Sequence, residues 1–225
     1  MHHTYTSYLY NRGIIPVVLG TVKRHPMKTN PFRNATFLTS ANEPRQLPAD
    51  TGAEIAFAGR SNAGKSSALN MICDQIGLAR TSKTPGRTQL LNVFVLDEAR
   101  RLIDLPGYGY AKVPEKMREH WRQMIDTYLR ERQSLRGVVL IMDSRHPLKE
   151  FDQQMLGFCR DIELACHILL TKSDKLGRSD AARTLAAVRK ECAAQGWPAT
   201  AQSFSALAKT GLDEARAILI GLLAG

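Results

Sequence analysis

The stretch AEIAFAGRSNAGKSSALN, residues 53–70, decides the fold of this 225-residue chain. Residues 53–59 are an apolar run that ends in glycine, which is typical of a buried strand. Residues 64–76 have a helical pattern, and the segment between them fits G-x-x-x-x-G-K-[ST]. Such a loop, placed between a strand and a helix, turns several backbone N–H groups toward one phosphate. The sequence therefore predicts a phosphate-binding loop at residues 59–66.

Each residue type in this loop has a physical reason. Gly59 and Gly64 let the backbone curl without Cβ clashes, and the helix that begins near Gly64 adds its positive dipole end. We expect Lys65 to bring its charge to the β- and γ-phosphates and Ser66 to offer a hydroxyl to Mg²⁺. The expected phosphate contacts are Gly59, Arg60, Ser61, Asn62, Ala63, Gly64, Lys65 and Ser66.

A second phosphate-side motif lies at the end of the strand predicted over residues 101–106. The residues DLPG at 104–107 fit D-x-x-G, in which Asp104 would hold Mg²⁺ through water and the Gly107 N–H would contact the γ-phosphate. The motif alone is weak because many turns contain it. Its position after the phosphate-binding loop makes it informative.

The residues expected to recognise the nucleotide base lie further along the chain. The residues TKSD at 171–174 fit [NT]-K-x-D, the box that recognises guanine. Guanine presents N1–H and an exocyclic amine, and the Asp174 carboxylate accepts both, whereas adenine does not supply this pair of donors. The stem of Lys172 covers the base plane, and the Ala206 N–H suits guanine O6. Thr171 stands where asparagine is commoner, so one supporting hydrogen bond is expected to change. The alternative for Asp174 is a turn or helix-capping residue.

The polar loop at residues 77–89 is a candidate switch. A switch needs a threonine whose hydroxyl binds Mg²⁺ and whose N–H senses the γ-phosphate. We prefer Thr88 to Thr84, because Thr88 lies nearer the next strand and Thr84 reads as a turn residue before Pro85.

Strands and helices alternate along the rest of the chain, which predicts a three-layer α/β fold with a mostly parallel sheet covered on both faces. Residues 91–97 and 101–106 form a hairpin, and residues 36–50 contain a short edge strand. The other predicted strands are 137–143, 165–172 and 199–204, and the other predicted helices are 114–133, 147–161, 178–195 and 210–223.

Composition bounds the partners and the compartment. The net charge is +10 and the pI about 9.7, which favours an anionic partner such as nucleic acid over a generic basic surface. No apolar run is long enough to span a bilayer, and Ile14–Leu19 is too short for a signal peptide. The four cysteines form no C-x-x-C pair and read as buried free thiols, so we expect a cytoplasmic protein.

The chain divides into two parts. Residues 1–35 have no sustained period and are expected to form a flexible arm, with Met27 as an alternative start. Residues 36–225 are expected to form a single GTPase domain.

Five motifs together closely resemble one family. They are GRSNAGKSS (59–67), TSKTPGRTQ (81–89), DLPGYGYA (104–111), MDSRHPLKEFDQQM (142–155) and LLTKSDK (169–175). The family is EngB, small bacterial GTPases of the TRAFAC class, and the resemblance covers about residues 36–222. It implies a P-loop GTPase fold with a six-stranded mixed sheet in which one strand is antiparallel. It also implies roles in assembly of the large ribosomal subunit and in normal cell division and septation.

The resemblance also carries over nucleotide contacts. Beyond the loop at 59–66, these are Gly86, Arg87, Thr88, Gln89, Leu90, Asp104, Leu105, Pro106, Gly107, Thr171, Lys172, Ser173, Asp174, Phe204, Ser205 and Ala206. Ser66 and Thr88 are the expected Mg²⁺ ligands. We expect catalytic contributions from Lys65, Asn62, Thr88 and Gly107.

Hydrolysis is expected to be slow. Many GTPases place a water-orienting glutamine directly after D-x-x-G, and this chain has Tyr108 there. The missing help would come from a monovalent cation such as K⁺ at Asn62, or from the ribosome as activator. The alternative for Asn62 is a loop former that tolerates unusual backbone angles.

The helix at 114–133 and the first switch are candidates for contact with ribosomal RNA. Their cations are Lys116, Arg118, Arg122, Arg130 and Arg132 on the helix, and Arg80, Lys83 and Arg87 in the switch. Lys and Arg contacts to phosphates would give salt-sensitive binding. The alternative is a solvated helix face. Of the interleaved Trp121 and Tyr128, Trp121 reads as a core anchor.

Two other functions compete with a GTP-hydrolysing switch. One is a GTP sensor with negligible turnover that gates a protein or RNA partner, and Tyr108 keeps it open. The other is an ATP-using P-loop enzyme, against which the TKSD box argues. We expect a monomer in solution.

Overall fold

The computed structural model describes residues 30–79, 90–108 and 115–224, with backbone alone at 115–118 and 121. Its strands are β1 (Thr36–Ala41), β2 (Ala53–Gly59), β3 (Leu91–Val95), β4 (Arg100–Asp104), β5 (Leu135–Asp143), β6 (Cys166–Thr171) and β7 (Ala199–Ser203). Its α-helices are α1 (Lys65–Ile72), α2 (Glu115–Glu131), α3 (Glu150–Asp161), α4 (Arg178–Ala194) and α5 (Leu212–Ala224). Short 3₁₀ turns lie at Pro44–Gln46 and Ser173–Lys175.

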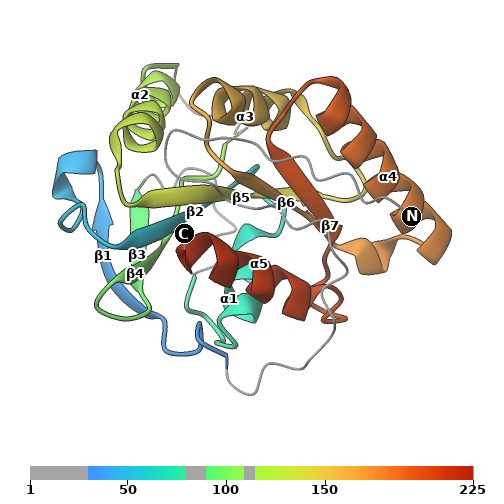
Figure 1. Cartoon of the computed structure of the whole chain (residues 1–225), viewed down its shortest axis with the longest axis horizontal. Coiled ribbons are helices and arrows are strands. Elements are labelled where there is room, and N and C mark those ends of the chain that lie inside the picture. The colour runs from blue at the N-terminus through green and yellow to red at the C-terminus, as the bar shows by residue number, and fades with distance from the viewer. Residues whose placement is uncertain (1–29, 80–89, 109–114, 225) are drawn as a thin grey trace.

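One mixed sheet runs through the middle of the molecule (Figure 1). The strand order is β1-β3-β4-β2-β5-β6-β7. Both ladders of β3, with β1 and with β4, are antiparallel, and the ladders among β4, β2, β5, β6 and β7 are parallel. The described sheet has seven strands, one more than the six that the family resemblance implied and as many as the strands predicted from the residues themselves. Its edge strand β1 falls within residues 36–50, where an edge strand is expected.

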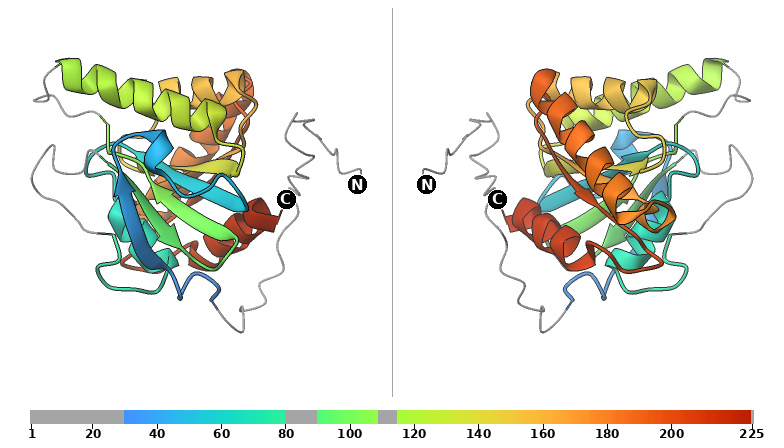
Figure 2. Two further views of the ribbon diagram at one scale, coloured as in Figure 1. Left: turned by 90° about the vertical axis from the view of Figure 1, so that its left-hand side faces the viewer. Right: turned by 90° about the vertical axis from the view of Figure 1, so that its right-hand side faces the viewer.

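The helices cover both faces of the sheet, as predicted. Helices α2, α3 and α4 lie on one face, and α1 and α5 on the other (Figures 1 and 2). Side chains along each strand alternate between the two cores, as the period of two requires: Ala56 and Ala58 face the first core, whereas Ile55 and Phe57 face the second. Because the central strands are buried on both faces, they read as continuous apolar runs.

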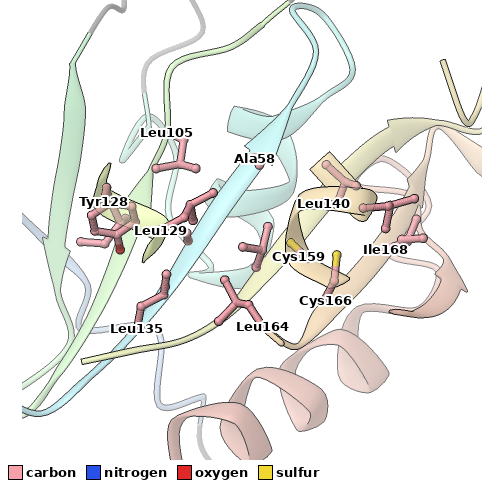
Figure 3. Close-up of a cluster of buried hydrophobic side chains, with 14 of the residues drawn as sticks. Ala58, Leu105, Tyr128, Leu129, Leu135, Leu140, Cys159, Leu164, Cys166 and Ile168 are labelled. Atoms are coloured by element: carbon pink, nitrogen blue, oxygen red, sulfur yellow. The ribbon is translucent and has the colours of Figure 1, made fainter. Parts of the chain in front are cut away.

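The core under α2 and α3 joins helices and strands that are distant in sequence (Figure 3). Tyr128 and Leu129 of α2 lie near Leu105, which follows β4, in this buried cluster. Cys159 of α3 lies near Cys166 of β6 in the same cluster. All four cysteines are free and buried, as expected. This packing fixes the ends of the strands from which the predicted site residues emerge.

The folded part begins before residue 36. Phe32 is fully buried in the core beside α1, and the Asn30 side chain donates to the Ile72 carbonyl at 3.0 Å. Gln75 donates to the carbonyls of Arg33 and Ala35. The boundary expected after residue 35 is therefore too late for residues 30–35; the rest of the predicted arm lies outside the described residues. In the described parts of the chain, no helix has the length and apolar character needed to cross a membrane.

Candidate nucleotide site

The predicted phosphate-binding loop lies where β2 passes into α1. β2 packs so closely on β5 that a Cβ at Gly59 would come within 2.7 Å of the Ile141 carbonyl oxygen. Two residues of the loop have left-handed backbone angles, Asn62 with φ 63° and Gly64 with φ 101°. Asn62 thus has the unusual backbone angles of a loop-forming residue, which asparagine tolerates better than most residues. Its role toward K⁺ stays a prediction.

Lys65 and Asp104 are brought together at the carboxyl ends of β2 and β4. The Lys65 ammonium forms an ion pair with Asp104 Oδ1, and both side chains are largely buried. Ser66, the predicted Mg²⁺ ligand, follows Lys65 in the first turn of α1. The two halves of the predicted phosphate and metal site therefore face each other across adjacent strands.

The segment that follows Asp104 runs alongside the phosphate-binding loop. Leu105 N–H donates to the Phe57 carbonyl at 2.9 Å, and Ser61 N–H donates to the Tyr108 carbonyl at 2.9 Å. Pro106 and Gly107 lie between these two bonds. The D-x-x-G segment is thus held to the loop by backbone hydrogen bonds.

Thr171 joins the predicted guanine box to the phosphate-binding loop. Its hydroxyl reaches two carbonyl oxygens, that of Ala63 and, at 3.0 Å, that of Met142. A hydroxyl carries one proton, so it donates to one of them at a time. Lys172 Nζ donates to the Asn62 carbonyl at 2.7 Å. The Thr171 hydroxyl thus lies between the phosphate-binding loop and the end of β5.

Asp174 is held in place by the loop after β7. The Ser205 hydroxyl donates to Asp174 Oδ1 at 2.5 Å, and this bond lowers the pKa of the Asp174 carboxyl. Ser173 N–H and hydroxyl both donate to the Phe204 carbonyl, at 3.2 and 3.0 Å. Ala206 is half-buried beside them. The two predicted base-reading segments, far apart in sequence, thus form one structural unit.

Tyr108 makes a contact that the sequence did not reveal. Its hydroxyl donates to Asp152 Oδ1 at 2.9 Å, and burial raises the pKa of this phenol well above its usual value. The other oxygen of Asp152 accepts the Lys149 N–H at 3.0 Å, which caps α3. Burial also raises the pKa of Asp152. An acidic residue in the first turn of a helix is the signal that identifies the cap, but nothing in the sequence links it to Tyr108.

The first switch lies mostly outside the described residues. This applies to the predicted sites Gly86, Arg87, Thr88 and Gln89, and also to Thr84, Arg80 and Lys83. Leu90, at the start of the next described segment, is half-buried.

The predicted RNA-binding face of α2 needs a correction. Arg132 is buried and donates to Glu54, because its helix ends over the amino end of β2. Arg130 is paired with Asp126 and lies over the Phe158 ring, 4.5 Å from its centroid. Arg122 is exposed. The side chains of Lys116, Arg118 and Trp121 lie outside the described residues, and Tyr128 is the described aromatic anchor of this helix.

The site combines a strand, a glycine loop and a helix, with Lys65 opposite Asp104. The TKSD box follows and is tied to the same loop. This arrangement defines a P-loop GTPase.

The comparisons with known proteins agree. A family model described as "50S ribosome-binding GTPase" matches residues 54–172. A "Probable GTP-binding protein EngB" of Coxiella burnetii (strain CbuG_Q212) is 55% identical over 188 residues, 84% of this chain and 92% of that protein. One of Azoarcus sp. (strain BH72) is 54% identical over 193 residues, 85% of this chain and 92% of that protein.

Solved structures show the same fold. The crystal structure of a probable GTP-binding protein engB aligns with a TM-score of 0.60 at 20% identity, over 76% of this chain and 99% of that one. A GTP-binding protein of Sulfolobus solfataricus in complex with GDP aligns with a TM-score of 0.52 at 17% identity, over 76% and 52%. The chain belongs to the EngB family of GTP-binding proteins, and it is a GTPase.

Proposed function

We propose that this chain is a Mg²⁺-dependent GTP switch with slow intrinsic hydrolysis that acts in assembly of the large ribosomal subunit. The observation that carries the nucleotide part is the bond network that ties Asp174 to Ser205 and Lys172 to Asn62. The ribosomal part is supported by the description of the matching family model. Through this role the protein would be needed for normal division and septation, and it would work as a cytoplasmic monomer.

The base and the phosphates would bind at opposite ends of one set of loops that hydrogen bonds connect. Asp174 accepts guanine N1–H and the exocyclic amine, and its lowered pKa keeps the carboxylate ionised for that task. The Ala206 N–H donates to guanine O6. The N–H groups of the loop at 59–66 bind the phosphates, with Lys65 as the fixed positive charge.

The donor set fits Mg²⁺. This ion is commonly held by few protein oxygens together with substrate phosphates and water. Ser66 would supply a hydroxyl and Asp104 an oxygen acting through water, and the ion pair of Asp104 with Lys65 supports a position beside the phosphates. Thr88 would complete the protein ligands. The bound ion would neutralise charge that develops on the phosphates during hydrolysis.

Slow turnover follows from what occupies the position of the usual glutamine. The Tyr108 hydroxyl is engaged with Asp152, on the side of α3. A phenol held in this way is a poor group for orienting an attacking water. We therefore assign the help that hydrolysis needs, a positive charge near the phosphates, to K⁺ beside Asn62 or to the ribosome. GTP turnover in K⁺ should exceed that in an equal concentration of Na⁺; equal rates would reject the K⁺ part.

Ribosome binding is tested by co-sedimentation. GTP-loaded protein should sediment with large subunits, and binding should weaken as salt rises. Reversing Arg118 and Arg122 to Glu should reduce the bound fraction. Arg183→Glu on α4, where the native arginine is paired with Asp180, is the matched control and should bind normally. Unchanged co-sedimentation of the double reversal at several salt concentrations would reject α2 as the contact.

A GTP sensor with negligible turnover is the second candidate, and the Tyr108–Asp152 bond favours it. Single-turnover hydrolysis with and without ribosomal particles separates the two. A switch should hydrolyse GTP faster in the presence of particles. A sensor should show no measurable turnover in either case.

A further inference from the structure

One carboxylate near the predicted guanine site holds two cations. Asp143 is the last residue of β5 and stands beside Thr171 in the parallel ladder with β6. Arg145 donates two hydrogen bonds to this carboxylate, from Nε to Oδ1 at 2.9 Å and from a terminal nitrogen to Oδ2 at 2.6 Å. Lys172 Nζ donates to Oδ2 at 2.9 Å. The Asp143 side chain is 16% exposed, against 32% for Lys172 and 44% for Arg145.

This carboxylate continues a chain of contacts that begins in the phosphate-binding loop. The same Lys172 ammonium that donates to Asp143 also donates to the Asn62 carbonyl at 2.7 Å. The two acceptors fix the ammonium from two sides, one on β5 and one on the loop. Arg145 and Lys172 hold the pKa of Asp143 well below its usual range, so the carboxylate is ionised at neutral pH. Arg145 also lies within electrostatic reach of Asp174.

We propose that Asp143 is a positioning residue of the guanine site, which fixes Lys172 against the loop and so sets the plane on which the base rests. The inference rests on the proposed function, because it takes Lys172 as the residue that covers the base. Without the carboxylate, Lys172 and Arg145 would be neighbouring cations with no anion between them. Their repulsion would move the lysine from the Asn62 carbonyl and loosen the loop and the base plane together. Asp143 acts through Lys172, so nucleotide affinity should change more than the chemical step.

The isosteric variant Asp143→Asn tests this directly. Charge-assisted hydrogen bonds are stronger than neutral ones, so the Kd for GDP should rise about tenfold, mainly through faster release. The KM for GTP should rise in parallel, while kcat should fall by less than about threefold. Asp180→Asn on α4 is the matched control, because Asp180 also accepts a hydrogen bond from an arginine, Arg183 at 2.6 Å, in an exposed pair. It should leave the Kd for GDP unchanged.

A double-mutant cycle separates positioning from a general loss of stability. In a Lys172→Ala background, Asp143→Asn should cause little further loss of GDP affinity, because the group it positions is gone. An additive loss in that background, or an unchanged Kd in the single variant, would overturn the inference. ADP binding by the wild type is measured alongside. If the wild type prefers GDP to ADP while Asp143→Asn binds normally, this inference alone fails; if the wild type has no such preference, the proposed guanine site fails and the inference with it.

Discussion

Two ends of the sheet each contain a carboxylate held by two cations, and they differ in burial. At the amino end of β2, Glu54 is fully buried and accepts hydrogen bonds from Arg101, Arg132 and the Tyr128 hydroxyl. At the carboxyl end of β5, Asp143 is partly exposed among residues of the predicted nucleotide site. Removing one partner of a buried ion pair leaves an uncompensated charge, whereas water compensates a partly exposed one.

The difference teaches that one arrangement of charges serves two purposes. The Glu54 cluster connects β2, β4 and the end of α2, so we expect it to contribute to stability. The Asp143 cluster connects loops that are expected to touch the ligand, so we expect it to contribute to affinity. Variants at Glu54, Tyr128 and Ser205 test that division.

The largest effect is expected at Glu54. Glu54→Gln keeps the shape but leaves Arg101 buried without its anion and Arg132 with Asp50 alone, 3.4 Å away, so the free energy of unfolding should fall by about 3–5 kcal/mol. Urea unfolding monitored by fluorescence measures it. Asp161→Asn, which removes the anion of the exposed pair with Arg160, is the control and should cost less than about 0.5 kcal/mol. A loss below about 1 kcal/mol at Glu54 would contradict the division.

A smaller effect is expected from pH at His167, in β6 between the two ends. Burial lowers the pKa of this imidazole from 6.5 to about 4, and its nitrogens contact Thr200 at 2.7 Å and Gln202 at 3.0 Å. Because the folded-state pKa is lowered, the neutral ring's contribution is complete above the unfolded pKa and is lost as pH falls through the folded one. Between pH 7 and pH 4.5 the loss should be about 2.5 kcal/mol.

His167→Gln removes the titrating ring and is the control for the pH dependence of wild-type stability. Urea unfolding at pH 7, 5.5 and 4.5 should show a shallower decline for the variant than for the wild type. Parallel declines would show that His167 is not the group responsible.

The smallest effects are expected from removing one hydroxyl at each end. Tyr128→Phe removes the bond to Glu54, and Ser205→Ala removes the bonds to Asp174 and to the Ala208 N–H. Each should lower the free energy of unfolding by about 1 kcal/mol. Only Ser205→Ala should also weaken GDP binding, by about fivefold, as titration calorimetry would measure. Equal GDP affinities for the two variants would break the comparison.

The sequence predicted most of the fold because its central strands are apolar runs of the kind that parallel sheets bury. Residues 53–59 gave the bounds of β2 as observed. The edge strand β1 was placed within residues 36–50 without exact bounds, because its first three residues are exposed and no buried apolar run marks it. The start of the domain before residue 36 was missed because the core around Phe32 is formed, apart from Ala35, by residues beyond position 50.

Site residues with a local sequence signal could be predicted, and contacts between distant residues could not. Glycines, Lys65, Asp104 and Asp174 follow local patterns and could be predicted from spacing. The partners of Arg132 and Tyr108 could not, because Glu54 and Asp152 lie 78 and 44 positions away and no local pattern connects them. A charged residue on a helix reads as solvated until its tertiary partner is seen.

The central claim is that this molecule reads guanine through Asp174. The most direct measurement is the set of Kd values for GDP, ADP and XDP, for the wild type and for Asp174→Asn. A site that pairs its ligand by specific hydrogen bonds rejects a ligand that leaves the covered partner unpaired, so the wild type should bind GDP at least about a hundredfold more tightly than ADP. The variant should shift its preference toward XDP. Equal wild-type affinities for GDP and ADP would contradict the account.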